Sequence, residues 1–131
     1  MLIERLLLTI ILALIGLLLY AFVRRLHLHQ VSKASPIKAT DGGRPTIMYF
    51  RSDSCAPCKT QNHFLQDLKQ SFGSGLTIHR IDTDEDQELA GKYGVFTLPT
   101  TLVLDGNGQV QYINYGLTNT TKLTRQMEKV I

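Results

Sequence analysis

The feature that most constrains this chain is an apolar run near its N-terminus. Residues 6–23 read LLLTIILALIGLLLYAFV and contain no charged side chain. At about 1.5 Å per residue, a helix over this run reaches roughly 27 Å, close to the thickness of the hydrocarbon core of a bilayer. Two arginines follow the run, and Tyr20 and Phe22 stand where aromatic side chains favour a membrane interface. We therefore expect residues 1–25 to form a transmembrane anchor, with the lipid bilayer as a partner.

Two other interpretations of the run have to be weighed. A helix that is apolar on every side is rarely buried in a soluble domain of this size. A cleaved signal peptide usually has an apolar region of roughly 7–15 residues, and here the run is longer and is followed by no small-x-small cleavage pattern. An uncleaved anchor in a single-pass cell-membrane protein is the interpretation that we favour.

Basic residues beside the run bear on its orientation. Arg24, Arg25, Lys33 and Lys38 follow it, whereas Arg5 precedes it beside an acidic neighbour. The positive-inside rule then places the rest of the chain on the cytoplasmic side. Anionic headgroups also account for these cations and for much of the formal charge of +3, so we expect no nucleic-acid partner.

The remainder of the chain has the pattern of a linker followed by one domain. Residues 26–44 have no sustained period, and their second half is dominated by Ser, Pro, Lys, Asp and two glycines, which is typical of a linker. Residues 45–131 then alternate strand and helix patterns. We expect strands at 46–50, 76–82, 100–105 and 109–115, and helices at 57–72, from Asp84 to about Tyr93, and after an Asn119 cap. The first two strands are joined through a helix and the last two by a Gly106-Asn107-Gly108 turn, which predicts an α/β fold with a mixed four-stranded sheet flanked by helices.

The motif that carries chemistry is Cys55-Ala56-Pro57-Cys58, which contains both cysteines of the chain. Cys55 lies between a predicted strand and a predicted helix, where first-turn N–H groups and the helix dipole stabilise a thiolate. Cys58, one turn further on, is expected to be more buried and to resolve a mixed disulfide. Pro57 needs no N–H in the first turn and stiffens the turn that holds the two sulfurs together. We therefore predict Cys55 as nucleophile, Cys58 as resolving cysteine and Pro57 as part of the active-site turn.

With this order of elements, the chain resembles the thioredoxin family. The resemblance covers about residues 45–131, and its most specific parts are CAPC at 55–58, KYGV at 92–95 and Leu98-Pro99-Thr100. It implies a thioredoxin-like fold, protein disulfide substrates and a thiol reductant. It implies no cofactor, since the dithiol itself carries two electrons.

The resemblance also implies roles for residues outside the motif. The family proline that matches Pro99 is cis and faces the nucleophilic cysteine, so a cis Leu98–Pro99 bond is expected. Leu98 would then offer backbone hydrogen bonds to an extended substrate. Gly116 either matches a family glycine that leaves room beside the active site or simply ends the last strand.

Several residues depart from the family pattern. Ser54 stands where the family commonly has tryptophan, Tyr49 replaces a buried acid, and His63 replaces a helix-kinking proline. The usual strand and helix before the first core strand are missing or reduced to part of 26–44. Because the buried acid is thought to help move the proton of the second cysteine, the proton acceptor for Cys58 is left open.

The leading functional hypothesis is a membrane-tethered disulfide reductase, since strongly oxidising relatives often carry a histidine between the cysteines. A disulfide oxidase or isomerase of the same fold is an alternative, and a tethered metal-binding or delivery protein is another. Zinc favours about four ligands, whereas Cys55, Cys58 and His63 supply three at best, so no metal site is expected. Anchored relatives in bacteria usually face outward, which opposes the orientation that the flanking charges indicate.

Overall fold

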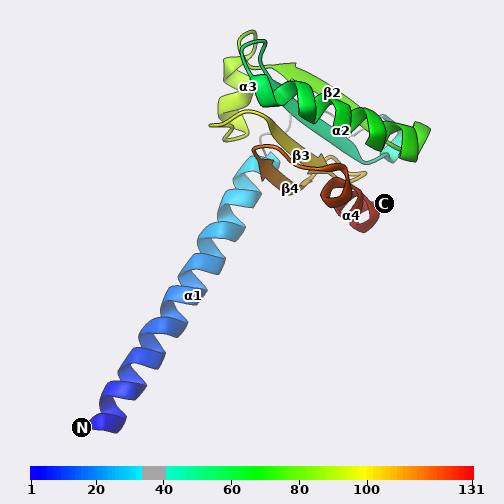
Figure 1. Ribbon diagram of the computed structural model, residues 1–131. Helices are drawn as coiled ribbons and strands as arrows, with labels where there is room; N and C mark the ends of the chain where they lie inside the picture. Colours follow the sequence, from blue (N-terminus) through cyan, green and yellow to red (C-terminus); the bar gives the residue numbers. More distant parts are fainter. Residues whose placement is uncertain (34–40) are drawn as a thin grey trace. The chain divides into compact units, whose positions relative to one another are not determined.

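The computed structural model describes residues 1–33 and 41–131; part of the predicted linker, residues 34–40, lies outside the described residues. The chain forms two compact units, Met1–Gln30 and Val31–Ile131. The first consists of helix, and the second holds the sheet and the remaining helices (Figure 1).

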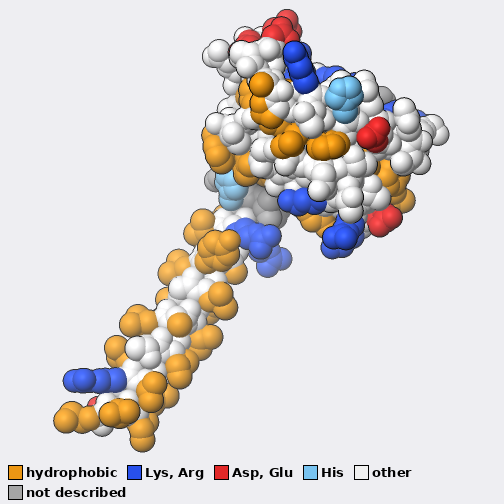
Figure 2. All heavy atoms as spheres, viewed as in Figure 1, with side chains coloured by type: hydrophobic (Ala, Val, Ile, Leu, Met, Phe, Trp, Pro, Cys, Tyr) orange, Lys and Arg blue, Asp and Glu red, His pale blue; other side chains and the backbone are white. Residues whose placement is uncertain are grey.

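The N-terminal unit is dominated by α1, which spans Leu2–Lys33. Within it, Leu2–His27 is long and apolar enough to cross a membrane, and none of its most apolar stretch is buried against protein. A signal sequence meets the same criteria of length and composition. Figure 2 shows hydrophobic side chains along the helix, with basic side chains near both of its ends. The helix continues into the segment that we predicted as a linker, because no glycine or proline interrupts residues 26–33.

The second unit contains the mixed four-stranded sheet that the sequence predicts. The strands are β1 (Thr46–Arg51), β2 (Thr77–Asp82), β3 (Thr100–Leu104) and β4 (Val110–Tyr115), in the order β2-β1-β3-β4. The helices are α2 (Ala56–Phe72), α3 (Gln87–Lys92) and α4 (Thr120–Val130), and short 3-10 turns span Asp41–Gly43 and Gly73–Gly75. β1 runs parallel to β2 and antiparallel to β3, which pairs antiparallel with β4. The parallel pair follows from the α2 crossover and the antiparallel pair from the hairpin.

The alternation of side chains along β1 divides the core into two clusters. Ile47 and Tyr49 pack with Leu65 of α2 and Met127 of α4 on one face. Met48 and Phe50 belong to the other cluster, together with Ala90 of α3 and the buried Tyr93. Because successive strand residues point to opposite faces, residues 47–50 supply both clusters alternately. β1 is therefore buried on both faces, and its C-terminal end leads directly into the cysteine motif.

Candidate active site

Cys55 occupies the N-cap of α2, as the strand-loop-helix pattern predicts. Its backbone is extended, with φ −85° and ψ 103°, and its side chain makes no capping hydrogen bond. Pro57 lies in the first turn. The first N–H groups of a helix have no partners within it and carry the positive end of the dipole. A thiolate at Cys55 would therefore lie beside donors and a favourable field.

Cys58 lies one turn further along and is much less accessible. It is 4% exposed, whereas Cys55 is half-buried, which agrees with the expected difference between the two sulfurs. The cysteines are joined in a disulfide, with their Cα atoms 5.4 Å apart. The Cys58 N–H donates to the Cys55 carbonyl oxygen at 3.3 Å. The local helix geometry thus holds both sulfurs within bonding distance.

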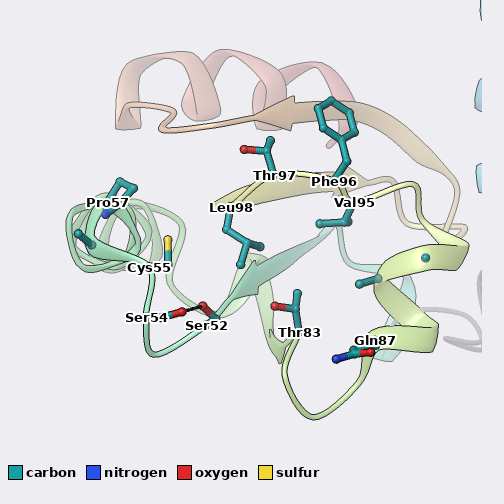
Figure 3. Close-up of a pocket in the computed structure, with 13 residues that line it drawn as sticks. Ser52, Ser54, Cys55, Pro57, Thr83, Gln87, Val95, Phe96, Thr97 and Leu98 are labelled. Atoms are coloured by element: carbon teal, nitrogen blue, oxygen red, sulfur yellow. Dashed lines mark hydrogen bonds between the residues drawn. The ribbon is translucent and has the colours of Figure 1, made fainter.

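A neutral groove of about 650 Å³ borders Cys55. Its walls come from the cysteine loop, from Thr83, from α3 and from residues 95–98, and none of the lining side chains is charged. Figure 3 shows Leu98 between the Cys55 sulfur on one side and Thr83 and Gln87 on the other. The arrangement leaves Cys55 open to a ligand that carries no charge near its point of contact.

The predicted proline segment forms one wall of this neutral groove. The Leu98–Pro99 peptide bond is cis, as the resemblance led us to expect. Leu98 lines the groove, whereas Pro99 is buried and contributes no lining surface. The Pro99 carbonyl oxygen accepts a hydrogen bond from the Gly116 N–H at 2.8 Å, so the proline segment is tied to the end of β4. Gly116 has φ +81°, which explains the glycine by backbone conformation, and a Cβ there would meet nothing within 4 Å.

An aromatic pair beside the groove is a feature that the sequence interpretation missed. Phe96 lines the groove and is 79% exposed. The centroid of its ring lies 4.5 Å from the centroid of the Tyr115 ring. Phe96 stands in the loop between KYGV and Leu98, where a large apolar residue has no strand or helix face to bury it. A large apolar residue in a loop beside Leu98 was therefore the sequence signal that could have identified Phe96 as a residue that contacts a substrate.

A second hollow, which we call the basic pocket, borders the buried cysteine. It has a volume of about 380 Å³ and is lined by both cysteines. Its titratable and charged lining residues are Tyr49, Arg51, Asp53, Lys59 and Arg80, in addition to the cysteines. Cys55 thus borders both hollows, whereas Cys58 borders the basic pocket and not the neutral groove.

Tyr49 makes a direct contact with the resolving cysteine. Its buried hydroxyl donates a hydrogen bond to the Cys58 carbonyl oxygen at 2.7 Å. Burial raises the pKa of Tyr49 above its usual value of 10.0, against the smaller opposing effect of Arg51 and Arg80. The residue that replaces the family acid is therefore a neutral phenol over the ordinary pH range.

Arg51 is held at the mouth of the basic pocket by two carboxylates. It pairs with Asp53 and, at 3.2 Å, with Asp82. The hydrogen bond to Asp53 is the main cause of the raised pKa of Arg51. Two other cations line the same pocket, Lys59 and Arg80, and neither forms an ion pair within the described residues.

The structure offers no support for a metal centre in the part of the chain that it describes. Among the side chains that the structure describes, those of residues 1–27 and 42–131, no three of His, Cys, Asp or Glu come together in a group able to hold an ion. His63 is exposed on α2, whereas Cys58 is buried.

Comparisons with known proteins agree with this geometry. The Thioredoxin family profile matches residues 32–129. Thioredoxin of Bacillus subtilis (strain 168) is 46% identical over 67 residues, which are 51% of this chain and 64% of that protein, so the chain spans slightly under two thirds of that relative. Thioredoxin of Rhodospirillum rubrum is 32% identical over 102 residues, which are 76% of this chain and 95% of that protein.

A solved structure has the same fold. The crystal structure of Deadhead, a germline-specific thioredoxin of Drosophila melanogaster, matches with a TM-score of 0.62 and 26% identity, over 69% of this chain and 84% of that one. The family profile covers most of the chain, and the paired cysteines and the cis proline segment lie where the resemblance implied. This chain belongs to the thioredoxin family.

Proposed function

We propose that this chain is a membrane-tethered thiol-disulfide oxidoreductase that reduces protein disulfides through Cys55 and Cys58. The observation that carries the proposal is the placement of Cys55 at the N-terminus of α2, with its partner sulfur buried one turn away. The first sulfur is accessible and the second is protected, which is the asymmetry that two-step exchange requires.

The reaction has two balanced steps. The Cys55 thiolate attacks one sulfur of a substrate disulfide, forms a mixed disulfide and expels the other substrate sulfur as a thiolate. The Cys58 thiolate then attacks the Cys55 sulfur, closes the Cys55–Cys58 disulfide and expels the second substrate thiolate. Two electrons pass to the substrate, whose thiolates take protons from solvent. An external thiol reductant returns the enzyme disulfide to the dithiol.

The neutral groove is the proposed substrate site. An extended peptide lying along residues 96–98 would find backbone donors and acceptors at Leu98, in a strand-addition mode. Cys55 lies at the side of this groove, and Phe96 offers an apolar surface at its rim. Protein disulfides in extended segments are therefore the substrate class that we propose.

The test uses the full chain in detergent micelles with insulin as the disulfide probe and dithiothreitol as reductant. We expect the wild-type chain to accelerate insulin reduction and Cys55→Ser to abolish the acceleration. Cys58→Ser, reduced beforehand and freed of dithiothreitol, should accumulate a mixed disulfide with insulin. The matched control is Ser74→Cys in a chain that lacks both native cysteines, which places one exposed thiol away from the N-terminus of α2. Equal trapping by this control would contradict the proposal.

The direction of the reaction has its own measurement. A reductase should equilibrate with glutathione at a low potential, and a value above about −150 mV would indicate the oxidase alternative. No histidine stands between the two cysteines, which favours the reducing direction.

We also propose that α1 tethers the redox domain to the cell membrane. The apolar stretch Leu2–His27 supports this by its length and composition. After alkaline washing of membranes, the intact chain should stay in the pellet with its N-terminus retained. Leu14→Arg should reduce insertion, because an arginine at the centre of a span is unfavourable by about 2.5–3.5 kcal/mol. A mature chain that begins beyond Arg25 would instead identify a cleaved signal.

A further inference from the structure

The two cysteines have different electrostatic surroundings. The neutral groove is lined by Cys55 and by no charged residue, whereas both cysteines line the basic pocket. A reductant thiolate that attacks Cys55 from the groove breaks the Cys55–Cys58 bond and expels the Cys58 sulfur as a thiolate. That new negative charge arises on Cys58, which lines the basic pocket and not the neutral groove.

We infer that Arg80 and Lys59 stabilise the Cys58 thiolate electrostatically, so that Cys58 reacts as a preformed anion without a carboxylate base. The inference rests on the proposed function, since it concerns the resolving step of the same exchange. It makes Arg80 and Lys59 positioning residues that act through their charge on the reacting sulfur.

The charge balance of the basic pocket supports this role. Arg51 is paired with Asp53 and Asp82, so its charge is largely compensated. Arg80 donates from Nε to the neutral amide oxygen of Asn62 at 3.2 Å, and among the described residues neither Arg80 nor Lys59 forms an ion pair. Two uncompensated cations therefore border the hollow that contains Cys58.

The titratable and charged groups that line the basic pocket with Cys58 come from β1, β2, α2 and the cysteine loop. β1 supplies Tyr49 and Arg51, the cysteine loop supplies Asp53 and Cys55, α2 supplies Lys59, and β2 supplies Arg80. Tyr49 stays neutral, because burial raises its pKa, and its O–H already donates to the Cys58 carbonyl oxygen. Asp53, the one carboxylate that lines the pocket, is exposed and bound to Arg51. The described surroundings therefore provide positive charge in place of a buried base.

The test measures the ionisation of Cys58 directly. In a full-length Cys55→Ser chain in detergent micelles, Cys58 is the only thiol, and its alkylation rate by iodoacetamide as a function of pH reports its thiolate fraction. We expect Arg80→Gln to move the midpoint of this profile upward by about half a pH unit at low salt, and Lys59→Gln to move it in the same direction. Asn62→Asp, which gives Arg80 a carboxylate partner, should also move it upward. Arg80→Lys should restore most of the wild-type midpoint.

Salt dependence and a matched control separate charge from structure. Both cations are exposed, so the shifts should shrink in about 1 M salt, where the Debye length falls to about 3 Å. Arg125→Gln removes an exposed cation on α4, outside the basic pocket, and should leave the midpoint unchanged.

The outcomes distinguish this inference from the proposed function. An unchanged midpoint in the Lys59→Gln/Arg80→Gln double variant, in a protein whose wild-type form reduces insulin, would overturn the inference and leave the proposed function standing. An equal shift in Arg125→Gln would also overturn it. A wild-type chain that exchanges no disulfide would overturn both.

Discussion

The Tyr49 hydroxyl donates a hydrogen bond to the backbone carbonyl oxygen of Cys58, 2.7 Å away in the core. The bond joins the middle of β1 to the first turns of α2, on which the resolving sulfur sits. It also places an uncharged donor where the family commonly has a buried acid. The stability and the pH response of the site should both depend on this contact.

Removing the Tyr49 hydroxyl should destabilise the protein modestly. Tyr49→Phe keeps the ring but deletes the donor, so the folded state should lose about 1 kcal/mol, the usual net contribution of such a bond. The measurement is the thermal unfolding of the full chain in detergent, followed by circular dichroism. Tyr112→Phe is the control, because the half-buried Tyr112 hydroxyl makes no hydrogen bond within the described residues. Equal losses in the two variants would contradict this account of the bond.

The raised pKa of Tyr49 predicts a loss of stability at high pH. Burial holds the pKa of the folded state above 10.0, the value expected in the unfolded chain. As pH rises past 10, the unfolded state loses this proton first, so unfolding becomes more favourable until the folded pKa is passed. For this one group the slope is at most about 1.4 kcal/mol per pH unit.

The comparison that isolates Tyr49 is the difference between wild type and Tyr49→Phe. Unfolding midpoints measured from about pH 9 to about pH 11 should fall more steeply for the wild type. Below pH 9 the difference should be constant, because both states then keep the proton. Parallel curves across the whole range would show that the folded pKa of Tyr49 is not raised.

Patterns of local origin were predicted well from the sequence. The four strands, the helix after the cysteines and the Asn119 cap follow from apolar periodicity and capping residues, and the structure confirms them within a few residues. The position of Cys55 also follows locally, because a strand, a short loop and a Pro57-containing first turn leave it at the helix start. The helix of 84–93 is shorter than predicted, since Asp86, not Asp84, accepts the capping bond from Leu89.

Features that depend on contacts between distant segments were not predictable in this way. Arg80 lies 22 positions after Cys58, and only the parallel pairing of β1 with β2 brings it to the basic pocket. The rings of Phe96 and Tyr115 are likewise in contact only because β3, which follows Phe96, pairs with β4, which ends at Tyr115. A single sequence has no local signal for such proximity. The hydrogen bond from Tyr49 to the Cys58 carbonyl oxygen was missed for the same reason. It forms only because α2 packs on β1.

Gln61 should be essential for holding α2 against the segment that follows β4. Its buried amide donates to the Thr118 carbonyl oxygen at 2.9 Å and accepts from the Thr118 N–H at 2.8 Å. Gln61→Leu removes both bonds and leaves two buried backbone groups without these partners, so we expect a loss of about 2–4 kcal/mol.

The unfolding midpoint in urea measures this loss on the full chain in detergent. Gln66→Leu is the matched control, since Gln66 is exposed on the same helix. Because Thr118 lies two residues after Gly116, which is bonded to Pro99, the Gln61→Leu chain should also show faster amide exchange at Gly116. Unchanged protection there would mean that the Gln61 bonds do not extend their effect to the groove wall.

Phe96 should contribute to substrate selection in the neutral groove. The residue is 79% exposed and its ring packs against the ring of Tyr115, so it presents an apolar surface beside the groove. Phe96→Ala should therefore lower kcat/KM about fivefold for a peptide disulfide with apolar residues beside its cysteine, which corresponds to about 1 kcal/mol. For a peptide with charged residues at those positions, the reduction in kcat/KM should be smaller. Charged groups gain little from contact with an apolar ring, so they lose little when the ring is removed. Ile131→Ala, which removes an equally exposed apolar side chain at the C-terminus, should change neither rate. Equal losses for both peptides would assign Phe96 to the structure of the loop, because a structural defect would not distinguish the two substrates.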